Sequence, residues 1–228
     1  MCISFGSRKR AKKYKNIFVK KVEETIKKDG LTYTLTEIEK DCWLRLLNGS
    51  LRSKDLFHNP VVANIMGNLP VSRTVVLRKV ITAEKKLFLH TDVRSSKWND
   101  LQQNENTSWL FYDSAARLQI RAAGKSTLHQ HDDIADAAWQ NTSAASRKTY
   151  MGEQSPSQKS DVPTSGLPER LLRTNPTLEE SEAGRKNFAV ICTHANWLEW
   201  LWLNSGGHKR AAFNYLPNNE FEASWLIP

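Results

Sequence analysis

The stretch "SRTVVLRKV", Ser72–Val80, places an apolar run between two arginines, Arg73 and Arg78. β-Branched residues fit a pleated, half-buried surface, so Arg73–Val80 predicts a buried strand. A guanidinium at each end of such a strand is costly to bury unless solvent or an anion receives it. The stretch therefore predicts a β-sheet with an anion bound beside it.

Further strand-like runs follow this one, separated by short polar turns. They are Lys86–Thr91, Ser108–Tyr112, Leu118–Ala123, Phe188–Thr193, Trp197–Leu203 and Lys209–Tyr215. This spacing is typical of an antiparallel sheet or barrel. The sequence therefore predicts a β-rich α+β domain.

Helical patterns alternate with these strands. The first spans Thr36–Asn48, where Thr36 and Glu39 have the spacing of a capping box and Gly49 is expected to close the helix. Two more are expected at Ser96–Gln103 and Asp132–Tyr150.

The charge divides the chain into an arm and a body. Residues 1–28 hold ten Lys/Arg against two Glu, which accounts for eight of the nine net positive charges. We expect residues 1–35 to be a basic N-terminal extension and residues 36–228 to form one domain. Within it, residues 151–186 are rich in Pro, Gly, Ser and Glu, which predicts a long excursion from the fold. The arm is a solvated extension or a site for polyanions; the near-neutral body makes nucleic-acid recognition the weaker hypothesis.

Several classes of protein have no support in the sequence. No apolar run approaches the roughly 20 residues that a membrane helix needs, and no apolar segment follows the basic N-terminus as in a secretory signal. Cys2, Cys42 and Cys192 are odd in number and far apart, which indicates reduced thiols and a cytoplasmic location.

Two short motifs are rejected. The "GKS" at residues 124–126 lacks the glycine of a phosphate-binding loop, because Gln119 occupies that position. His129 and His131 have no nearby carboxylate or cysteine pattern to complete a metal site, so no metal is expected. No motif of a hydrolase is present either.

A cationic turn follows the second strand. In "LHTDVRSSKWNDL", residues 89–101, a strand ends near Thr91 and a helix begins near Ser95 or Ser96. Arg94 and Lys97 flank that helix start, where the backbone dipole disfavours a cation by roughly 0.3–1 kcal/mol unless an anion lies between them. Amides, hydroxyls and two cations together predict a phosphate cradle; a solvated helix start is the alternative.

Two later stretches suggest an aromatic ligand. In "RLQIRAAG", Gln119 shares a strand face with arginines, and its amide can both donate to and accept from a heterocycle. "NWLEWLWL" carries Trp197, Trp200 and Trp202, which suit a planar ligand but are as compatible with a core.

Taken in order, these blocks resemble a known family. They are R-T-V-V-L-R (73–78), T-D-x-R-S-x-K (91–97), R-L-Q-I-R-x-x-G (117–124), W-x₃-S-x₂-S-R-x₂-Y (139–150), E-W-L-x-L-x₄-H-x-R (199–210) and a final L-x-P. The order resembles the FMN-binding split-barrel flavoproteins related to pyridoxamine 5′-phosphate oxidase, especially their uncharacterised cyanobacterial-type branch. It covers about residues 36–228.

The resemblance implies an antiparallel split β-barrel of Greek-key type with peripheral helices, and a homodimer with FMN at its interface. It implies that the anion is the phosphate of FMN. The residues expected at the cofactor are Arg73, Thr74, Val75, Val76, Leu77, Arg78, His90, Thr91, Arg94, Ser95, Ser96, Lys97, Gln119, Trp200 (or Trp202) and Arg210. His208 and Arg210 are the nearest candidates for a catalytic role.

The expected substrate residues depart from the oxidases of that family. Where those enzymes hold the substrate phosphate with a tyrosine, an arginine and a serine, this chain has Ala138, Thr142 and Ser146. Gly206 stands where they carry an arginine over the substrate ring. We therefore expect an FMN-dependent oxidoreductase with an unidentified small-molecule substrate; a non-catalytic flavin-binding or sensing module and a true pyridoxamine 5′-phosphate oxidase are the alternatives.

Overall fold

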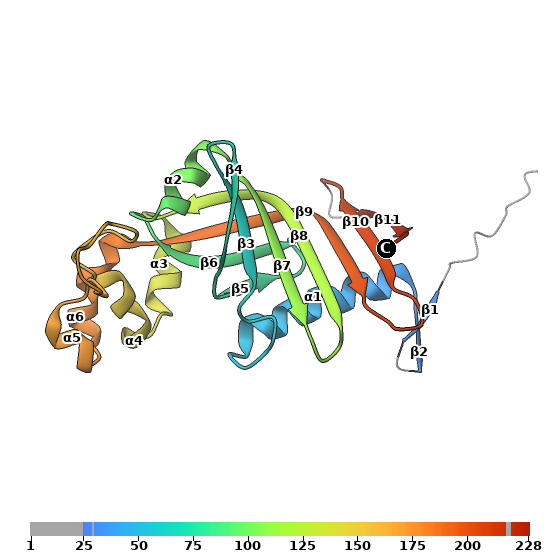
Figure 1. The fold of residues 1–228 in the computed structure, drawn as a ribbon, viewed down its shortest axis with the longest axis horizontal. Helices are drawn as coiled ribbons and strands as arrows, with labels where there is room; N and C mark the ends of the chain where they lie inside the picture. Colours follow the sequence, from blue (N-terminus) through green and yellow to red (C-terminus); the bar gives the residue numbers. More distant parts are fainter. Residues whose placement is uncertain (1–24, 29, 218–219) are drawn as a thin grey trace, which may run out of the picture.

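The structure is a computed structural model that describes residues 25–28, 30–217 and 220–228. Most of the basic arm lies outside these residues. The strands are β1 (Ile26–Lys28), β2 (Leu31–Tyr33), β3 (Val61–Met66), β4 (Leu69–Thr74), β5 (Lys79–Ile81), β6 (Lys86–Asp92), β7 (Asn106–Asp113), β8 (Leu118–His129), β9 (Phe188–Trp202), β10 (Lys209–Tyr215) and β11 (Phe221–Leu226). The helices are α1 (Leu35–Leu51), α2 (Ser96–Gln103), α3 (Asp133–Gln140), α4 (Ala144–Arg147), η1 (Lys148–Met151), α5 (Glu169–Arg173), α6 (Leu178–Ser181) and η2 (Glu182–Asn187) (Figure 1).

The main sheet branches at β9. Strand β8 pairs with one edge of β9 along nearly its whole length, from His129 opposite Val190 to Leu118 opposite Trp202. The other edge of β9 is shared: β6 pairs with its first half and β10 with its second half. All these pairs are antiparallel, and β7, β3 and β4 extend the sheet beyond β8. The predicted antiparallel split-barrel fold is confirmed.

The pairing of β8 with β9 has one irregularity. The register shifts between Ala123 and Gly124, which is a β-bulge. A Cβ added at Gly124 would lie 1.9 Å from the carbonyl oxygen of His194, so the close approach of the two backbones requires glycine. The bulge joins the two runs predicted at Phe188–Thr193 and Trp197–Leu203 into the single strand β9.

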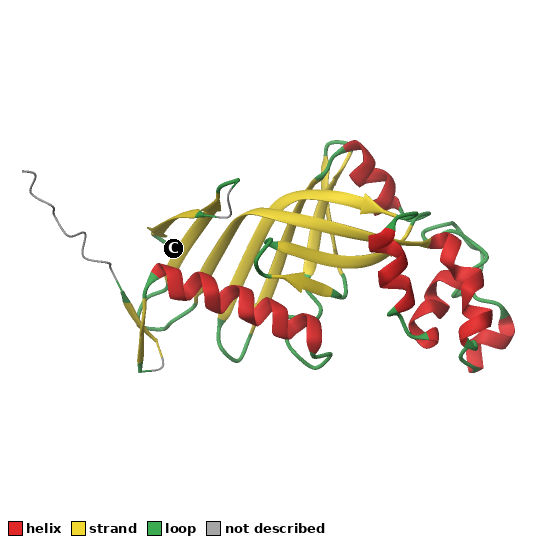
Figure 2. Ribbon diagram, turned by 180° about the vertical axis from the view of Figure 1, so that it is seen from behind, coloured by secondary structure: helices red, strands yellow, loops and turns green. Residues whose placement is uncertain are grey.

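Helix α1 crosses one face of the sheet (Figure 2) and begins earlier than predicted. Thr34 is the N-cap, and its hydroxyl and the carboxylate of Glu37 form the capping box. Glu39, predicted for that role, is instead buried and accepts hydrogen bonds from Lys85 Nζ at 2.7 Å and Tyr215 Oη at 2.8 Å. The predicted stop at Gly49 was also wrong, since the helix continues to Leu51.

The strand predicted at Arg73–Val80 is two strands. β4 ends at Thr74, after which the amides of Val75 and Leu77 donate to the carbonyls of Pro60 and His58 in an irregular segment. Pairing resumes when the Arg78 amide donates to Phe88 O at 2.9 Å, just before β5. Arg73 therefore lies in β4, whereas Arg78 lies in the irregular segment directly before β5.

A helical lobe covers the first half of β9. The single helix predicted at Asp132–Tyr150 is broken, because Thr142 Oγ1 donates to Ala138 O at 2.7 Å and Ser143 caps a new helix. Arg147 is buried here: it packs over the Trp139 ring at 4.3 Å and donates to Glu182 Oε1 at 2.5 Å. The excursion at residues 151–186 is partly helical, with α5, α6 and most of η2.

The two faces of β9 serve two hydrophobic clusters. The larger one lies between the sheet and α1 and includes Trp43, Trp109, Leu198 and Trp200. The smaller one lies under the helical lobe. It consists of Phe88, Ala135, Trp139, Tyr150, Phe188, Val190 and Cys192.

The structure also bears on the cysteines and on membrane-spanning helices. Cys42 and Cys192 are both free and buried. Among the described helices, none has the length and apolar character needed to cross a membrane.

Candidate functional site

Arg73 leaves β4 on the side that faces α2. Its Nη1 donates to Asn64 Oδ1 on the neighbouring strand β3, and Asn64 Nδ2 donates to Asp100 Oδ2 in α2 at 3.0 Å. Asn64 is buried, and Arg73 is half-buried. The side-chain amide of Asn64 thus links the Arg73 guanidinium to Asp100. The Asp100 carboxylate bonds to Asn64 and not directly to Arg73.

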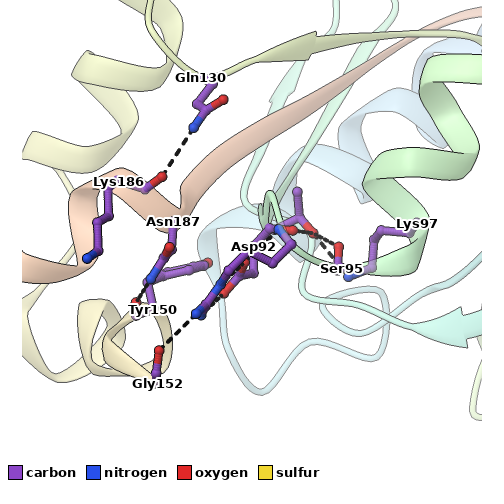
Figure 3. Close-up of polar contacts among 10 residues, drawn as sticks. Asp92, Ser95, Lys97, Gln130, Tyr150, Gly152, Lys186 and Asn187 are labelled. Atoms are coloured by element: carbon purple, nitrogen blue, oxygen red, sulfur yellow. Dashed lines mark hydrogen bonds and ion pairs between the residues drawn. The ribbon is translucent and has the colours of Figure 1, made fainter. Parts of the chain in front are cut away.

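Lys97 approaches the same place from the first turn of α2. Its Nζ donates to Thr91 Oγ1 at 3.1 Å, and Thr91 Oγ1 lies 3.1 Å from Ser95 Oγ. Figure 3 shows Ser95 and Lys97 side by side at the start of the helix. Ser95 is the N-cap residue, but its side chain makes no capping hydrogen bond, and no acidic residue lies in the first turn. The first-turn amides of α2 therefore lack a side-chain acceptor.

Both cations of this cluster have lowered pKa values. Burial lowers the pKa of Lys97, and the nearby Arg73 lowers it further, while Asp92 partly opposes both. Burial also lowers the pKa of Arg73, with Asp100 opposing. Within the described residues neither cation forms an ion pair with a carboxylate. We call Arg73, Thr91, Ser95 and Lys97 the cationic cradle; two close cations at an uncapped helix start could hold a phosphate-like group.

The remaining residues of this stretch lie around the cradle in different ways. Thr74 and Ser96 are exposed, and Val75 and Val76 are half-buried. Leu77 is fully buried in the larger cluster, and its amide already donates to His58 O. Leu77 thus supports the site from the core.

Arg94 is directed away from the cradle. Its Nη2 and Nε bind the Asp92 carboxylate at 2.7 and 3.0 Å, and its Nη1 donates to Gly152 O at 3.0 Å. The Val93 amide donates to Asn187 O, and Asn187 Nδ2 donates to Tyr150 O at 2.8 Å. Figure 3 shows this chain of contacts running from Asp92 to Gly152 and Tyr150. Arg94 therefore ties the turn before α2 to the start of the excursion, and Val93 ties the same turn to Asn187, just after its end.

The predicted residues of β8 to β10 form a separate group. Gln119 pairs with Leu201, which pairs with Arg210, so the two polar side chains flank Leu201 on one face of the sheet. Arg210 binds the buried Glu199 carboxylate through Nη2 at 2.5 Å and Nε at 2.9 Å. Trp200 lies on the opposite face, 2% exposed, in the larger cluster.

His208 lies two residues before Arg210, just before the start of β10. It is exposed in the turn between β9 and β10, beside Gly207, whose φ is 115°. Trp202, the alternative to Trp200, is half-buried against the larger cluster.

An open cavity of about 370 Å³ lies at β3, β7 and β8, and none of the four cradle residues lines it. Asn64, the partner of Arg73, lines it, together with Ala63, Ile65, Ser108, Ala123 and Gly124 on β3, β7 and β8. Asn64 and Asp100 were not predicted from the sequence as site residues. A buried asparagine inside the apolar run "VVANIM" was the available signal, because buried amides need partners.

One family model matches part of this chain. The family model described as "Pyridoxamine 5′-phosphate oxidase, FMN-binding domain" matches residues 40–130, a range that contains the whole cradle. The resemblance found in the sequence is confirmed, and FMN is the cofactor of this domain. No curated protein matches the chain.

Two solved structures share the fold. A pyridoxamine 5′-phosphate oxidase-related, FMN-binding protein from Nostoc punctiforme has a TM-score of 0.66 and 22% identity, over 83% of this chain and 96% of that one. PhzG from Burkholderia lata, solved in complex with tetrahydrophenazine-1-carboxylic acid, has a TM-score of 0.61 and 15% identity, over 83% and 90%.

Proposed function

We propose that this chain, whose residues 40–130 belong to the pyridoxamine 5′-phosphate oxidase FMN-binding family, is an FMN-dependent oxidoreductase with a substrate other than pyridoxamine phosphate. The observation that carries the proposal is the cationic cradle, where Arg73 and Lys97 lie close together without a carboxylate partner among the described residues. A terminal phosphate would supply the missing negative charge.

Each residue of the cradle would make a different contact with the phosphate. Arg73 would bind it through the guanidinium that Asn64 orients, and Lys97 and the first amides of α2 would bind it from the helix. The hydroxyls of Thr91 and Ser95 lie within the same group and can donate to phosphate oxygens. When bound, FMN supplies hydride and electron transfer, and the protein supplies position and electrostatics.

We further propose that two copies of the chain complete each site. Gln119 and Arg210 lie on the central strands, whereas the cradle lies at α2, in a different part of the molecule (Figure 1). One flavin reaches both groups only if a second copy supplies one of them. The sheet face that α1 leaves open carries Leu110 and Tyr112, which are 37% and 48% exposed. An exposed apolar face of this kind suits a two-fold contact between identical chains.

The side chains that would bind a pyridoxamine phosphate substrate are absent or occupied. Ala138 has no polar side chain, and the Thr142 hydroxyl already donates a hydrogen bond to Ala138 O at 2.7 Å. Gly206 is exposed and has no side chain to cover a substrate ring. Two lost charge-assisted contacts of about 1.5–3 kcal/mol each would lower catalytic efficiency by a few hundredfold or more.

The experiment starts with the absorption spectrum of the purified protein. We expect a flavin spectrum at one FMN per chain, and we expect the bound flavin to be FMN and not FAD. The spectrum should bleach under a chemical or nicotinamide reductant and recover in air. Pyridoxamine phosphate should be oxidised far more slowly than by a true oxidase assayed beside it. A protein that binds FMN but keeps it oxidised with every reductant would favour the alternative, a non-catalytic flavin-binding module; absence of flavin binding would refute both.

A further inference from the structure

A hydroxyl, an imidazole and a carboxylate form a chain of short contacts where β8 leads into α3. Thr127 Oγ1 lies 2.7 Å from His129 Nε2, and His129 Nδ1 lies 2.7 Å from Asp132 Oδ2. Thr127 and His129 are two residues apart in β8, so the alternation of the strand puts both side chains on one face. Asp132 is the N-cap of α3, and its Oδ1 accepts from the Ala135 amide at 3.0 Å. The strand and the helix cap thus hold the three side chains together.

The contacts determine which group donates each hydrogen bond. Burial raises the pKa of Asp132, but hydrogen bonds from Ala135 and His129 outweigh it and lower the pKa below its ordinary value. An ionised carboxylate only accepts, so His129 Nδ1 donates to it and Nε2 is left as an acceptor. The Thr127 hydroxyl therefore donates to Nε2; its contact with Cys192 O is longer, at 3.4 Å. An imidazole in this state is a general base for the hydroxyl.

The backbone beside Thr127 offers a further hydrogen-bond donor. The Ser126 amide donates to Glu105 O, on the edge of β8 that faces away from β9. Because strand amides alternate between the two edges, the Leu128 amide points to that edge as well. Strand β7 pairs with β8 only as far as Lys125, so it does not cover Leu128. The amide that follows a nucleophile is one from which a developing oxyanion can be stabilised.

The same side chains do not make a metal site. His129 and Asp132 are two potential ligands, and the third member of the chain is a hydroxyl. In the part of the chain that the structure describes, no three His, Cys, Asp or Glu side chains come together to hold a metal. Both ring nitrogens of His129 are bonded, in contrast to His90, whose buried Nδ1 has no hydrogen-bond partner among the described residues. The arrangement suits proton transfer.

We infer that Thr127, His129 and Asp132 form a second active site, which hydrolyses small activated carboxylic esters. Thr127 Oγ attacks the ester carbonyl carbon, and its proton passes to His129 Nε2. The ester C–O bond then breaks, the alcohol leaves with that proton, and the acyl group stays on Thr127. Water attacks the acyl-threonine and gives a proton to His129, and that proton returns to Thr127 Oγ as the carboxylic acid leaves. Asp132 orients the imidazole and stabilises its protonated form.

The exposure of the triad limits its substrates. Thr127 is exposed, and the side chains of His129 and Asp132 are 16% and 44% exposed. An acyl group therefore reaches the hydroxyl without displacing protein, and the reactivity of the ester selects the substrate more than its shape does. The inference is independent of the proposed function, because none of the three residues belongs to the cationic cradle or to the residues expected at the flavin.

The test measures the release of p-nitrophenolate from p-nitrophenyl acetate by the full-length, FMN-loaded protein. The wild type should react at least about tenfold faster than Thr127→Val, which keeps the shape of the side chain and removes the hydroxyl. Thr127→Ser, which keeps a hydroxyl, should remain active, and His129→Gln should lose the activity. His131→Gln, the same substitution at an exposed histidine two residues further on, is the matched control and should equal the wild type. FMN affinity should be unchanged in all four variants.

Peptide mapping identifies the acylated atom without any substitution. Mass spectrometry of wild-type protein quenched in acid during turnover should place an acetyl group on Thr127, and this result decides the matter if Thr127→Val does not fold by circular dichroism. Acetyl groups on lysines alone, or equal rates for the wild type and a folded Thr127→Val, would overturn the inference. So would a wild type that releases p-nitrophenolate no faster than buffer. A protein that hydrolyses the ester but binds no FMN would refute only the proposed function.

Discussion

Replacing Lys97 by methionine should weaken FMN binding without weakening the flavin-free protein. In the flavin-loaded protein the substitution removes one charge-assisted hydrogen bond to phosphate, worth about 1.5–3 kcal/mol, so the dissociation constant should rise about 10- to 150-fold. In the flavin-free protein Lys97 only donates to the Thr91 hydroxyl, which keeps Ser95 as a partner at 3.1 Å. Methionine fills a similar volume and is not repelled by Arg73.

The free energy of unfolding of the flavin-free variant should therefore equal or exceed that of the wild type, by about 0–1 kcal/mol. Urea unfolding measures this value, and quenching of flavin fluorescence measures the affinity. Lys125→Met is the control: Lys125 is exposed on β8 and pairs with Glu105 on the surface, so both measurements should stay within about 0.5 kcal/mol. Unchanged FMN affinity, or a loss of more than about 1 kcal/mol in the flavin-free variant, would refute the cradle.

The same lysine gives the cradle a pH dependence. Burial and Arg73 hold the folded-state pKa of Lys97 below its ordinary value of 10.5, so the unfolded chain binds more protons between the two pKa values. The penalty is complete below the folded-state pKa and is relieved as the pH rises toward 10.5. Stability of the flavin-free protein should gain from this lysine across that window, while FMN affinity should fall. Lys97→Met should lack both contributions.

Other predictions address the rest of the molecule. His90→Phe should raise the free energy of unfolding by about 1 kcal/mol, because it removes a buried nitrogen without a partner; a lower value in urea would contradict this. Gly124→Ala should destabilise the protein by about 3 kcal/mol or more, because its Cβ would overlap the His194 carbonyl; a melting temperature equal to the wild type would exclude such a clash. Leu110→Glu should shift sedimentation from dimer to monomer and lower FMN affinity. Deleting residues 1–24 should leave FMN affinity intact and abolish salt-sensitive binding to heparin.

The sequence predicted local features that depend on neighbouring residues. Helix α2 and strand β10 have the predicted bounds, Ser96–Gln103 and Lys209–Tyr215. These bounds were predicted correctly because short-range periodicity carries the information. The assignment of Arg73 and Lys97 to a phosphate site stays a prediction.

The errors arose where long-range contacts decide. The apolar run Val75–Leu77 has strand composition, but its amides pair with the irregular segment at His58–Pro60. Thr36 and Glu39 fit a capping box by spacing, yet Lys85 and Tyr215, distant in sequence, hold the Glu39 carboxylate. Trp200, or Trp202 in its place, stays a predicted cofactor residue; the alternation of β9 directs the Trp200 ring into the larger cluster. Spacing alone does not say which face of a strand is covered.

Strand β9 pairs with β8, β6 and β10, and this pairing predicts whether the fold would persist after the backbone is cut by a protease. Residues 153–165 are exposed and join two parts that are anchored independently, at Tyr150 and at Phe188. A protease that nicks this segment would separate the chain into an N-terminal fragment with β8 and β6 and a C-terminal fragment with β9 to β11. Because β9 is the central strand, the ladder hydrogen bonds and both hydrophobic clusters would still hold the fragments together. The nicked protein is therefore a natural starting point for fragment complementation, with each half incomplete until the other supplies its strand partners.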